Sequence, residues 1–185
     1  MTKIFLDTEF TGLHQHTTLI SVGLAAENGN VFYAELTDYN KTQADEWIRL
    51  NVLPLLSGNL ACDAFSDAQP TVLCGGTRQE VSLALRRWLA RYGGKNSVEI
   101  WADVLAWDWV LFCELFGGAM MLPEQVFYIP FDLSTLLKLK GAGPETIREE
   151  LGEVRWTHPI LNLAKHHALY DALLEKDIFE NINKR

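Results

Sequence analysis

Cysteine is scarce in this sequence, which has only Cys62, Cys74 and Cys113 among its 185 residues. Their number is odd and no two have Cys-x-x-Cys spacing, which argues against a disulfide framework and against a thiolate zinc site. We therefore expect three reduced, partly buried thiols. No apolar run approaches the roughly 20 residues of a membrane helix, and no basic and apolar leader opens the chain. These absences favour a cytoplasmic protein without a membrane span.

Positive charge is also scarce, with 16 lysines and arginines against 24 aspartates and glutamates and a formal net charge of −8. Binding along a phosphate backbone relies on clustered Lys and Arg, so a broad nucleic-acid groove is not expected. With 48% hydrophobic and 22% charged residues, the composition is otherwise ordinary for a globular protein. The length suits one substantial core, and we expect one domain over residues 1–185.

The first third of the sequence predicts an antiparallel β-meander followed by a helix. Asn28-Gly29 is a strong hairpin signal between two apolar runs. Trp47 and Leu50 recur at helical spacing before Pro54 disturbs the pattern. The predicted strands cover residues 3–7, 18–26 and 30–36, and the predicted helix covers 43–56. Residues 57–76 have little periodicity, and we expect a long loop there in which short structure stays open.

The rest of the sequence predicts helices alternating with short strands. Thr77 and Glu80 form a capping box, after which apolar residues recur at helical spacing up to Gly93. The predicted strands cover 98–102 and 126–129, and the predicted helices cover 77–92, 107–116, 132–140 and 162–182. Three leading strands followed by strands that alternate with helices fit an α/β fold, with a mixed sheet flanked by helices.

Two acids lie one residue apart near the N-terminus, in the segment KIFLDTEFTGL. Side chains at i and i+2 of a strand point to the same face, so Asp7 and Glu9 are expected to converge. A divalent cation at this point would offset the mutual repulsion of the two carboxylates. Asp-x-Glu at a strand end also occurs as a turn cap or a solvent-facing pair, so this pair alone leaves metal binding open.

Two further segments supply acids in unusual surroundings. Asp108 stands between two tryptophans in WDWVLF, at the start of an apolar helical stretch where an unpartnered charge would be costly. Asp103 is a rival for the same role because it also follows the predicted strand 98–102. Near the C-terminus, HHALYDA places Asp171 five residues after His166 and four after His167.

The three segments DTEFTGL, WDWVLF and HHALYDA resemble, in order and rough spacing, the three motifs of the DEDDh 3′-to-5′ exonucleases. Within that superfamily the chain is most similar to the small bacterial and phage 3′–5′ exoribonucleases, and DTEFTGL is also similar to the first motif of oligoribonuclease. The resemblance spans nearly the whole chain and implies a ribonuclease H-like fold. One departure is Val104, where the family often has Asn or a similar polar residue that orients the substrate.

The resemblance implies two divalent cations bound by four acids: Asp7, Glu9, Asp108 and Asp171. Carboxylate oxygens suit Mg²⁺ or Mn²⁺ better than zinc. Asp7 would bridge both cations, and Asp108 would act mainly through water on one of them. Glu9, which also counts as catalytic, and Asp171 would complete the site on the nucleophile side. The family pattern favours Asp108 over Asp103, and two bound cations would take the net charge from −8 to −4.

The resemblance also implies a histidine general base, because an imidazole changes protonation near neutral pH. His166 has the DEDDh spacing and is favoured, whereas His167 stands where the tyrosine of the DEDDy branch would fall. After the first motif, the resemblance places Phe10, Thr11 and Leu13 against the terminal nucleotide, with the Thr11 N–H able to meet a sugar hydroxyl. For Phe10, a role in the core and a role in base stacking both stay open.

The implied function is a metal-dependent 3′-to-5′ exoribonuclease that releases nucleoside 5′-monophosphates from single-stranded RNA or 3′ overhangs. Such an enzyme grips a short 3′ end, so a strongly basic surface is not required. DNA is the alternative substrate, because no residue can be assigned to the 2′-hydroxyl. A proofreading subunit and a catalytically inactive nucleic-acid-binding or regulatory protein are further hypotheses. The resemblance also suggests a homodimer.

Overall fold

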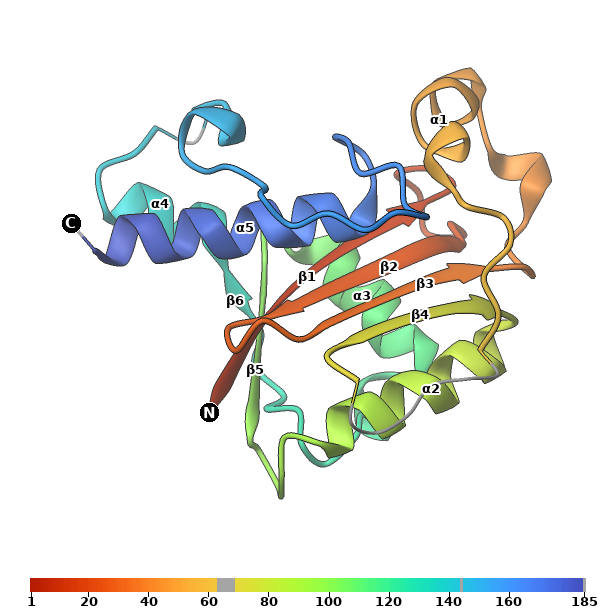
Figure 1. The fold of residues 1–185 in the computed structure, drawn as a ribbon, viewed down its shortest axis with the longest axis horizontal. Coiled ribbons are helices and arrows are strands. Elements are labelled where there is room, and N and C mark those ends of the chain that lie inside the picture. The colour runs from red at the N-terminus through yellow and green to blue at the C-terminus, as the bar shows by residue number, and fades with distance from the viewer. Residues whose placement is uncertain (63–68, 144, 185) are drawn as a thin grey trace.

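A six-stranded mixed sheet lies at the centre of the protein, with the strand order β4-β3-β2-β1-β5-β6 (Figure 1). The computed structural model describes residues 1–62, 69–143 and 145–184. Strands β1, β2 and β3 pair antiparallel, whereas the β3–β4, β1–β5 and β5–β6 pairs are parallel. The strands cover Thr2–Phe10 (β1), Leu19–Ala26 (β2), Val31–Leu36 (β3), Thr71–Gly76 (β4), Val98–Ala102 (β5) and Phe131–Asp132 (β6). The predicted meander and mixed sheet are thereby confirmed.

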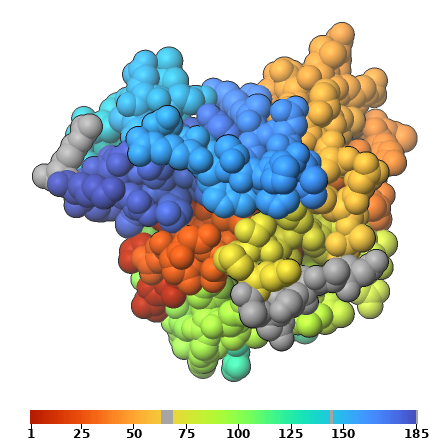
Figure 2. All heavy atoms as spheres, viewed as in Figure 1, coloured from red at the N-terminus to blue at the C-terminus, as the bar shows by residue number. Residues whose placement is uncertain are grey.

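Helices cover both faces of the sheet (Figure 1). They are α1 (Glu46–Asn51), α2 (Arg78–Ala90), α3 (Ala106–Leu115), α4 (Leu133–Leu139) and α5 (Ala168–Asn183). One face packs with α2 and α3 around a core that includes Trp88 and Phe112, and the other packs with α5 around Tyr33 and Leu169. In Figure 2 the segment of residues 145–167, drawn in lighter blue, covers part of the sheet face on which α5 packs. No helix in the described ranges is long and apolar enough to cross a membrane.

The structure differs from the sequence prediction at one predicted loop and at one predicted strand. Within the expected loop 57–76, residues Thr71–Gly76 form β4, which pairs parallel to β3; residues 63–68 lie outside the described part of the chain. Alternate residues of β4 are buried, a period of two that the glycines at its end obscure. The expected strand 126–129 is reduced to one bridge between Val126 and Val98. Pro130, which has no N–H to donate, separates that bridge from β6.

Two predicted helices are shorter than expected. In the range 43–56 the α-helix is confined to α1, and its buried contact comes from Ile48, whereas Trp47 and Leu50 are 49% and 68% exposed. The C-terminal helix begins at Ala168 and not near 162. His166 has a left-handed backbone with φ of +70°, which the preceding chain needs to turn into α5.

The expectation of three reduced thiols was also wrong, because Cys62 and Cys74 form a disulfide with their Cα atoms 4.3 Å apart. Gly75 explains how the two residues meet. A Cβ at Gly75 would lie 2.2 Å from the carbonyl oxygen of Leu60, so only glycine lets the chain before Cys62 pack this closely on β4. Cys113 is free and buried.

Candidate active site

Strand β1 places Asp7 and Glu9 on the face of the sheet that α5 covers. Phe5 lies on the same face, with its ring 5.3 Å from that of Phe179 in α5, while Ile4 and Leu6 pack into the core beneath α2 and α3. Because side chains alternate along a strand, Asp7 and Glu9 follow Phe5. β1 pairs with β5 only over Thr2–Phe5, so the edge of β1 beyond that point is free to meet α3.

Asp108, in the first turn of α3, reaches this free edge. Its Oδ1 accepts hydrogen bonds from the backbone N–H of Thr8 at 2.9 Å and from the Thr8 hydroxyl at 2.6 Å. Asp103 is engaged elsewhere, since its carboxylate accepts from Arg148 Nε and from the Ser134 hydroxyl, each at 2.6 Å. The structure therefore joins Asp108, and not Asp103, to the strand that carries Asp7 and Glu9.

The first turn of α5 brings Asp171 to the same place. Asp171 Oδ2 accepts a hydrogen bond from the His166 N–H at 2.9 Å, which ties the carboxylate to the segment before the helix. Gly23 makes this approach possible. It is the partner of Asp7 in β2, and a Cβ there would lie 2.4 Å from backbone atoms of Ala168 and Leu169. Direct packing of α5 on Gly23 thus sets the distance between Asp171 and β1.

The two adjacent histidines have different roles in the structure. His167 is the N-cap of α5: its Nδ1 accepts from the Leu169 N–H at 3.2 Å, and its ring stacks on Tyr33 at 4.4 Å. Burial lowers the pKa of His167 to about 4. The His166 ring instead lies against Trp47, with 4.8 Å between ring centroids. Only His166 presents a side chain to the acids.

The acids and His166 surround one cavity of about 590 Å³. One ligand atom from each of Glu9, His166 and Asp171 lies within 4.8 Å of the others. The cavity wall also includes Asp45, the N-cap of α1, and Trp47 in its first turn, neither of which was predicted from the sequence. The available signal was an aromatic residue beside a helix-capping aspartate. The residues that line the cavity are Asp7, Thr8, Glu9, Phe10, Gly12, Leu13, Asp45, Trp47, Ile48, Asp108, His166 and Asp171.

All four motif acids resist ionisation in the cavity. Burial, followed by the neighbouring Asp171 and Asp108, raises the pKa of Glu9 to about 9. Burial and then Asp171 also raise the pKa of Asp7. Burial raises the pKa of Asp171 to about 7 and that of Asp108 to about 6, against the hydrogen bonds from His166 and Thr8 that favour their charged forms. Such a cluster has high affinity for positive charge.

Phe10, Thr11 and Leu13, which were expected to contact the terminal nucleotide, have different surroundings in the structure. Phe10 and Leu13 line the cavity, and Leu13 is 75% exposed. Phe10 also packs against the core, with its ring 6.1 Å from that of Trp107. Thr11 is buried, and its N–H donates to the carbonyl of Thr18 at 3.0 Å. This donor already holds the turn after β1, and the expected contact between the Thr11 N–H and a sugar hydroxyl stays a prediction.

Comparison with known proteins identifies the family. A model of the 3′-5′ exoribonuclease Rv2179c-like domain matches residues 64–183. The chain belongs to this family. It is 34% identical over 158 residues to two proteins of Mycobacterium tuberculosis, 3′-5′ exoribonuclease Rv2179c of strain H37Rv and 3′-5′ exoribonuclease MT2234.1 of strain CDC 1551, covering 83% of this chain and 87% of each relative.

A solved structure of wider relationship confirms the fold. The whole chain superposes on 40% of the zinc-bound E. coli ExoI chain, from a complex with single-stranded DNA, with a TM-score of 0.54 and 14% sequence identity. The protein thus has the ribonuclease H-like exonuclease fold that its motifs predicted. As an Rv2179c-like exoribonuclease homologue it is a hydrolase, and family membership implies metal dependence and a nucleic-acid substrate.

The cavity suits a divalent cation. Its donors are carboxylate oxygens, the ligands that Mg²⁺ and Mn²⁺ prefer. Oδ2 of Asp7 is buried, and no group in the described part of the chain donates a hydrogen bond to it. A buried carboxylate oxygen without a partner is costly, and a cation would remove that cost. The residues present therefore fit the metal dependence of the Rv2179c-like family.

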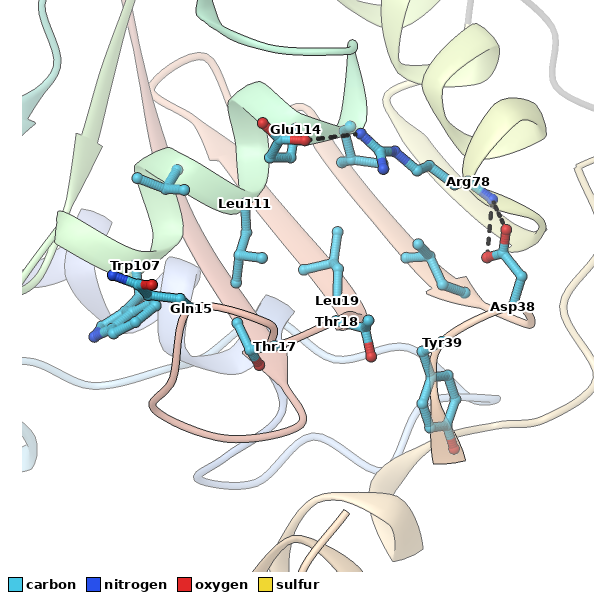
Figure 3. A pocket seen from close by; sticks show the side chains of 13 residues that line it. Gln15, Thr17, Thr18, Leu19, Asp38, Tyr39, Arg78, Trp107, Leu111 and Glu114 are labelled. Carbon is cyan, nitrogen blue, oxygen red and sulfur yellow. Dashed lines mark hydrogen bonds and ion pairs between the residues drawn. The ribbon is translucent and has the colours of Figure 1, made fainter. Parts of the chain in front are cut away.

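A separate pocket of about 350 Å³ lies beside the cavity, between α3 and the loop after β1 (Figure 3). Arg78 spans one end, donating from its guanidinium to Glu114 at 3.3 Å and from its backbone N–H to Asp38 at 3.0 Å. Trp107, at the other end, links the pocket to the cavity through its contact with Phe10. None of the four motif acids is among the described residues lining this pocket, so it is not where we expect a cation to bind.

Proposed function

We propose that this protein is a metal-dependent 3′-to-5′ exoribonuclease that hydrolyses RNA from single-stranded 3′ ends or 3′ overhangs and releases nucleoside 5′-monophosphates. The observation that carries the proposal is the convergence of four acids and His166 on one cavity, from β1, α3, α5 and the residues just before α5. The names of the M. tuberculosis relatives support RNA as the substrate. DNA is the second candidate substrate, favoured by the fold shared with a nuclease seen on single-stranded DNA.

The four acids would hold two divalent cations, Mg²⁺ or Mn²⁺. When bound, the cations would activate a water and neutralise charge on the attacking and leaving oxygens. Asp7, whose buried carboxyl group interacts with those of Asp171, Asp108 and Glu9, would help to hold the cations. Glu9 and Asp171 would serve the side of the attacking water, next to His166, which agrees with the proximity of their ligand atoms. Asp108, which Thr8 orients, would act on the other side, mainly through water.

His166 would accept the proton of the attacking water at an imidazole nitrogen. Burial and the positive charge of Lys165 lower its pKa, so the ring is neutral and ready to accept a proton at neutral pH. The edge contact with Trp47 restricts the position of the ring, and the hydrogen bond from the backbone N–H of His166 to Asp171 fixes the main chain that carries it. We place the base at His166 and not at His167, because Nδ1 of His167 caps α5 and its ring is buried against Tyr33.

The terminal nucleotide would lie between Leu13, Phe10 and Trp47 at the mouth of the cavity. Leu13 and Trp47 are 75% and 49% exposed, and bases stack readily on exposed aromatic rings. We further propose that residues 1–185 act as one exonuclease domain, because the acids come from strands and helices spread over the whole chain. A cytoplasmic location and a homodimer stay predictions.

The test is hydrolysis of 3′-overhang RNA, matched DNA and 3′-blocked RNA by the purified protein with Mg²⁺ or Mn²⁺. We expect release of monophosphates that depends on a free 3′ end and on metal and is lost in Asp7→Asn. Glu153→Gln is the matched control, since Glu153 pairs with Arg155 at the surface and lines neither cavity that contains Asp7. No hydrolysis with either metal would favour a binding or regulatory protein, and preferential hydrolysis of DNA would reverse the choice of substrate.

A further inference from the structure

A fifth acid, Glu175, is buried next to the four motif acids. It lies one helical turn after Asp171 on α5 and is only 5% exposed. Its Oε1 accepts a hydrogen bond from the backbone N–H of Asp103 at 2.9 Å, at the end of β5. Its Oε2 is buried, and no donor in the described part of the chain reaches it. Oε1 of Glu175 therefore has an evident structural role, and Oε2 has none.

Oε2 of Glu175 belongs to the surroundings of the proposed cation site. Glu175 lines a cavity of about 400 Å³ together with Asp7, His166 and Asp171, three of the residues that also line the catalytic cavity. Asp7 Oδ2 is likewise buried without a hydrogen bond, so two acids of this region each keep one oxygen without a partner.

The positive charge nearby gives this oxygen no hydrogen bond among the described contacts, although Arg148 and Glu175 attract each other electrostatically. The guanidinium of Arg148 donates to Asp103 from Nε at 2.6 Å and from Nη2 at 3.1 Å, and Nη2 also donates to Ser134 at 2.9 Å. Burying a carboxyl oxygen without a partner costs stability, and such groups in native proteins generally meet a ligand, an ion or water. The site therefore contains more acid than the four-carboxylate motif requires.

We propose that Glu175 is a fifth acid of the cation site and takes part in holding the divalent cation through its unbonded Oε2. This inference rests on the proposed function, because it assumes that Asp7 holds a cation. It predicts that removing the Glu175 charge weakens cation binding even when the fold is preserved. The competing account is purely structural: Glu175 would serve only to accept the Asp103 N–H at the end of β5.

The two accounts are separated by Glu175→Gln, because a glutamine oxygen can still accept the Asp103 N–H but carries no charge. Glu175→Leu is the second variant, which removes both the acceptor and the charge. Glu180→Gln on the same helix is the matched control, since its carboxylate is at the surface and pairs with Lys176. The measurement is isothermal titration of the metal-free full chain with Mn²⁺, alongside thermal melts in EDTA and in excess Mn²⁺.

We expect Glu175→Gln to melt in EDTA at or above the wild-type temperature, to bind Mn²⁺ at least tenfold more weakly and to gain less stability from Mn²⁺. Glu175→Leu should lose the same affinity, and Glu180→Gln should keep it. Wild-type affinity in Glu175→Gln, with affinity lost in Asp7→Asn, would overturn this inference and leave the proposed function intact. If Glu175→Gln fails to fold, wild-type affinity in Glu175→Leu overturns it equally. Absence of Mn²⁺ binding by the wild-type protein would overturn both.

Discussion

Substitution of Gly23 by alanine should damage the active site without touching any residue in it. Gly23 pairs with Asp7 in the sheet and supports the start of α5. An added Cβ would lie 2.4 Å from backbone atoms of Ala168 and Leu169, whereas ordinary contact begins at 3.4 Å. The opposing atoms are backbone, so they cannot rotate away, and the helix start must retreat by about 1 Å.

The size of the effect follows from that displacement. Overpacking a well-packed site costs about 1–3 kcal/mol, and each kcal/mol lowers the melting temperature by roughly 2–4 °C in a protein of this length. Asp171 and His166 move with the start of α5, and a 1 Å misplacement of reacting groups can cost on the order of 100-fold in rate. We therefore expect kcat to fall on the order of 100-fold, a proportionally larger loss than the decrease in the free energy of unfolding.

The assay is steady-state hydrolysis of a short 3′-overhang RNA with saturating Mn²⁺, together with thermal melts of the same preparations. Gly94→Ala is the matched control, because no described atom lies within 4 Å of a Cβ at Gly94 and it needs no left-handed backbone. Folded Gly23→Ala protein with kcat within about twofold of wild type would refute the claim that this contact sets the position of α5. Equal losses in both variants would refute it as well.

Three further predictions concern charge in the site. Asp7→Asn should abolish hydrolysis yet raise the melting temperature in EDTA, because it removes an acid whose ionisation is opposed by burial and by Asp171; a lower melting temperature would contradict this. His166→Asn should lower kcat by about 10²–10⁴-fold with little change in melting temperature. His167→Asn should mainly lower the melting temperature, because it loses the stacking on Tyr33. A large loss of kcat in His167→Asn, with kcat kept in His166→Asn, would assign the base to His167. In EDTA the free energy of unfolding should fall as the pH rises from about 5 to 9, because folded Glu9 and Asp171, with pKa values of about 9 and about 7, keep protons that the unfolded chain releases near pH 4. Denaturant titrations at several pH values measure this dependence of the free energy of unfolding on pH, which saturating Mn²⁺ should weaken. A free energy of unfolding that rises with pH in EDTA would contradict the acid cluster.

Local pattern was sufficient where one physical rule dominates. The alternation of side chains in a strand placed Asp7 and Glu9 on one face, and Asn28-Gly29 marked the turn between β2 and β3. The capping box of Thr77 and Glu80 is present at the start of α2. These features depend on neighbours within a few residues, so sequence spacing alone carries them.

Local pattern failed where distant segments compete for the same residues. Thr71–Gly76 becomes a strand because β3 offers an edge for parallel pairing, which no local signal announces. Cys62 meets Cys74 only because Gly75 lets the chain near Leu60 pack on β4. Trp47 fits the apolar stripe of a helix, yet in the fold Ile48 takes the buried position and leaves Trp47 at the mouth of the cavity.

The sequence by itself determined the family and the mixed sheet, because motif order and side-chain period depend on residue spacing alone. It also supplies the prediction of which acids form the site. The tertiary structure decided which candidates meet. It joined Asp108 to β1 through Thr8 and tied Asp103 to Arg148. It turned the His166 ring toward the acids, buried His167 as a helix cap and placed Glu175 beside the cluster. These outcomes depend on how α3 and α5 pack against the sheet, and packing between distant elements has no signature in local spacing.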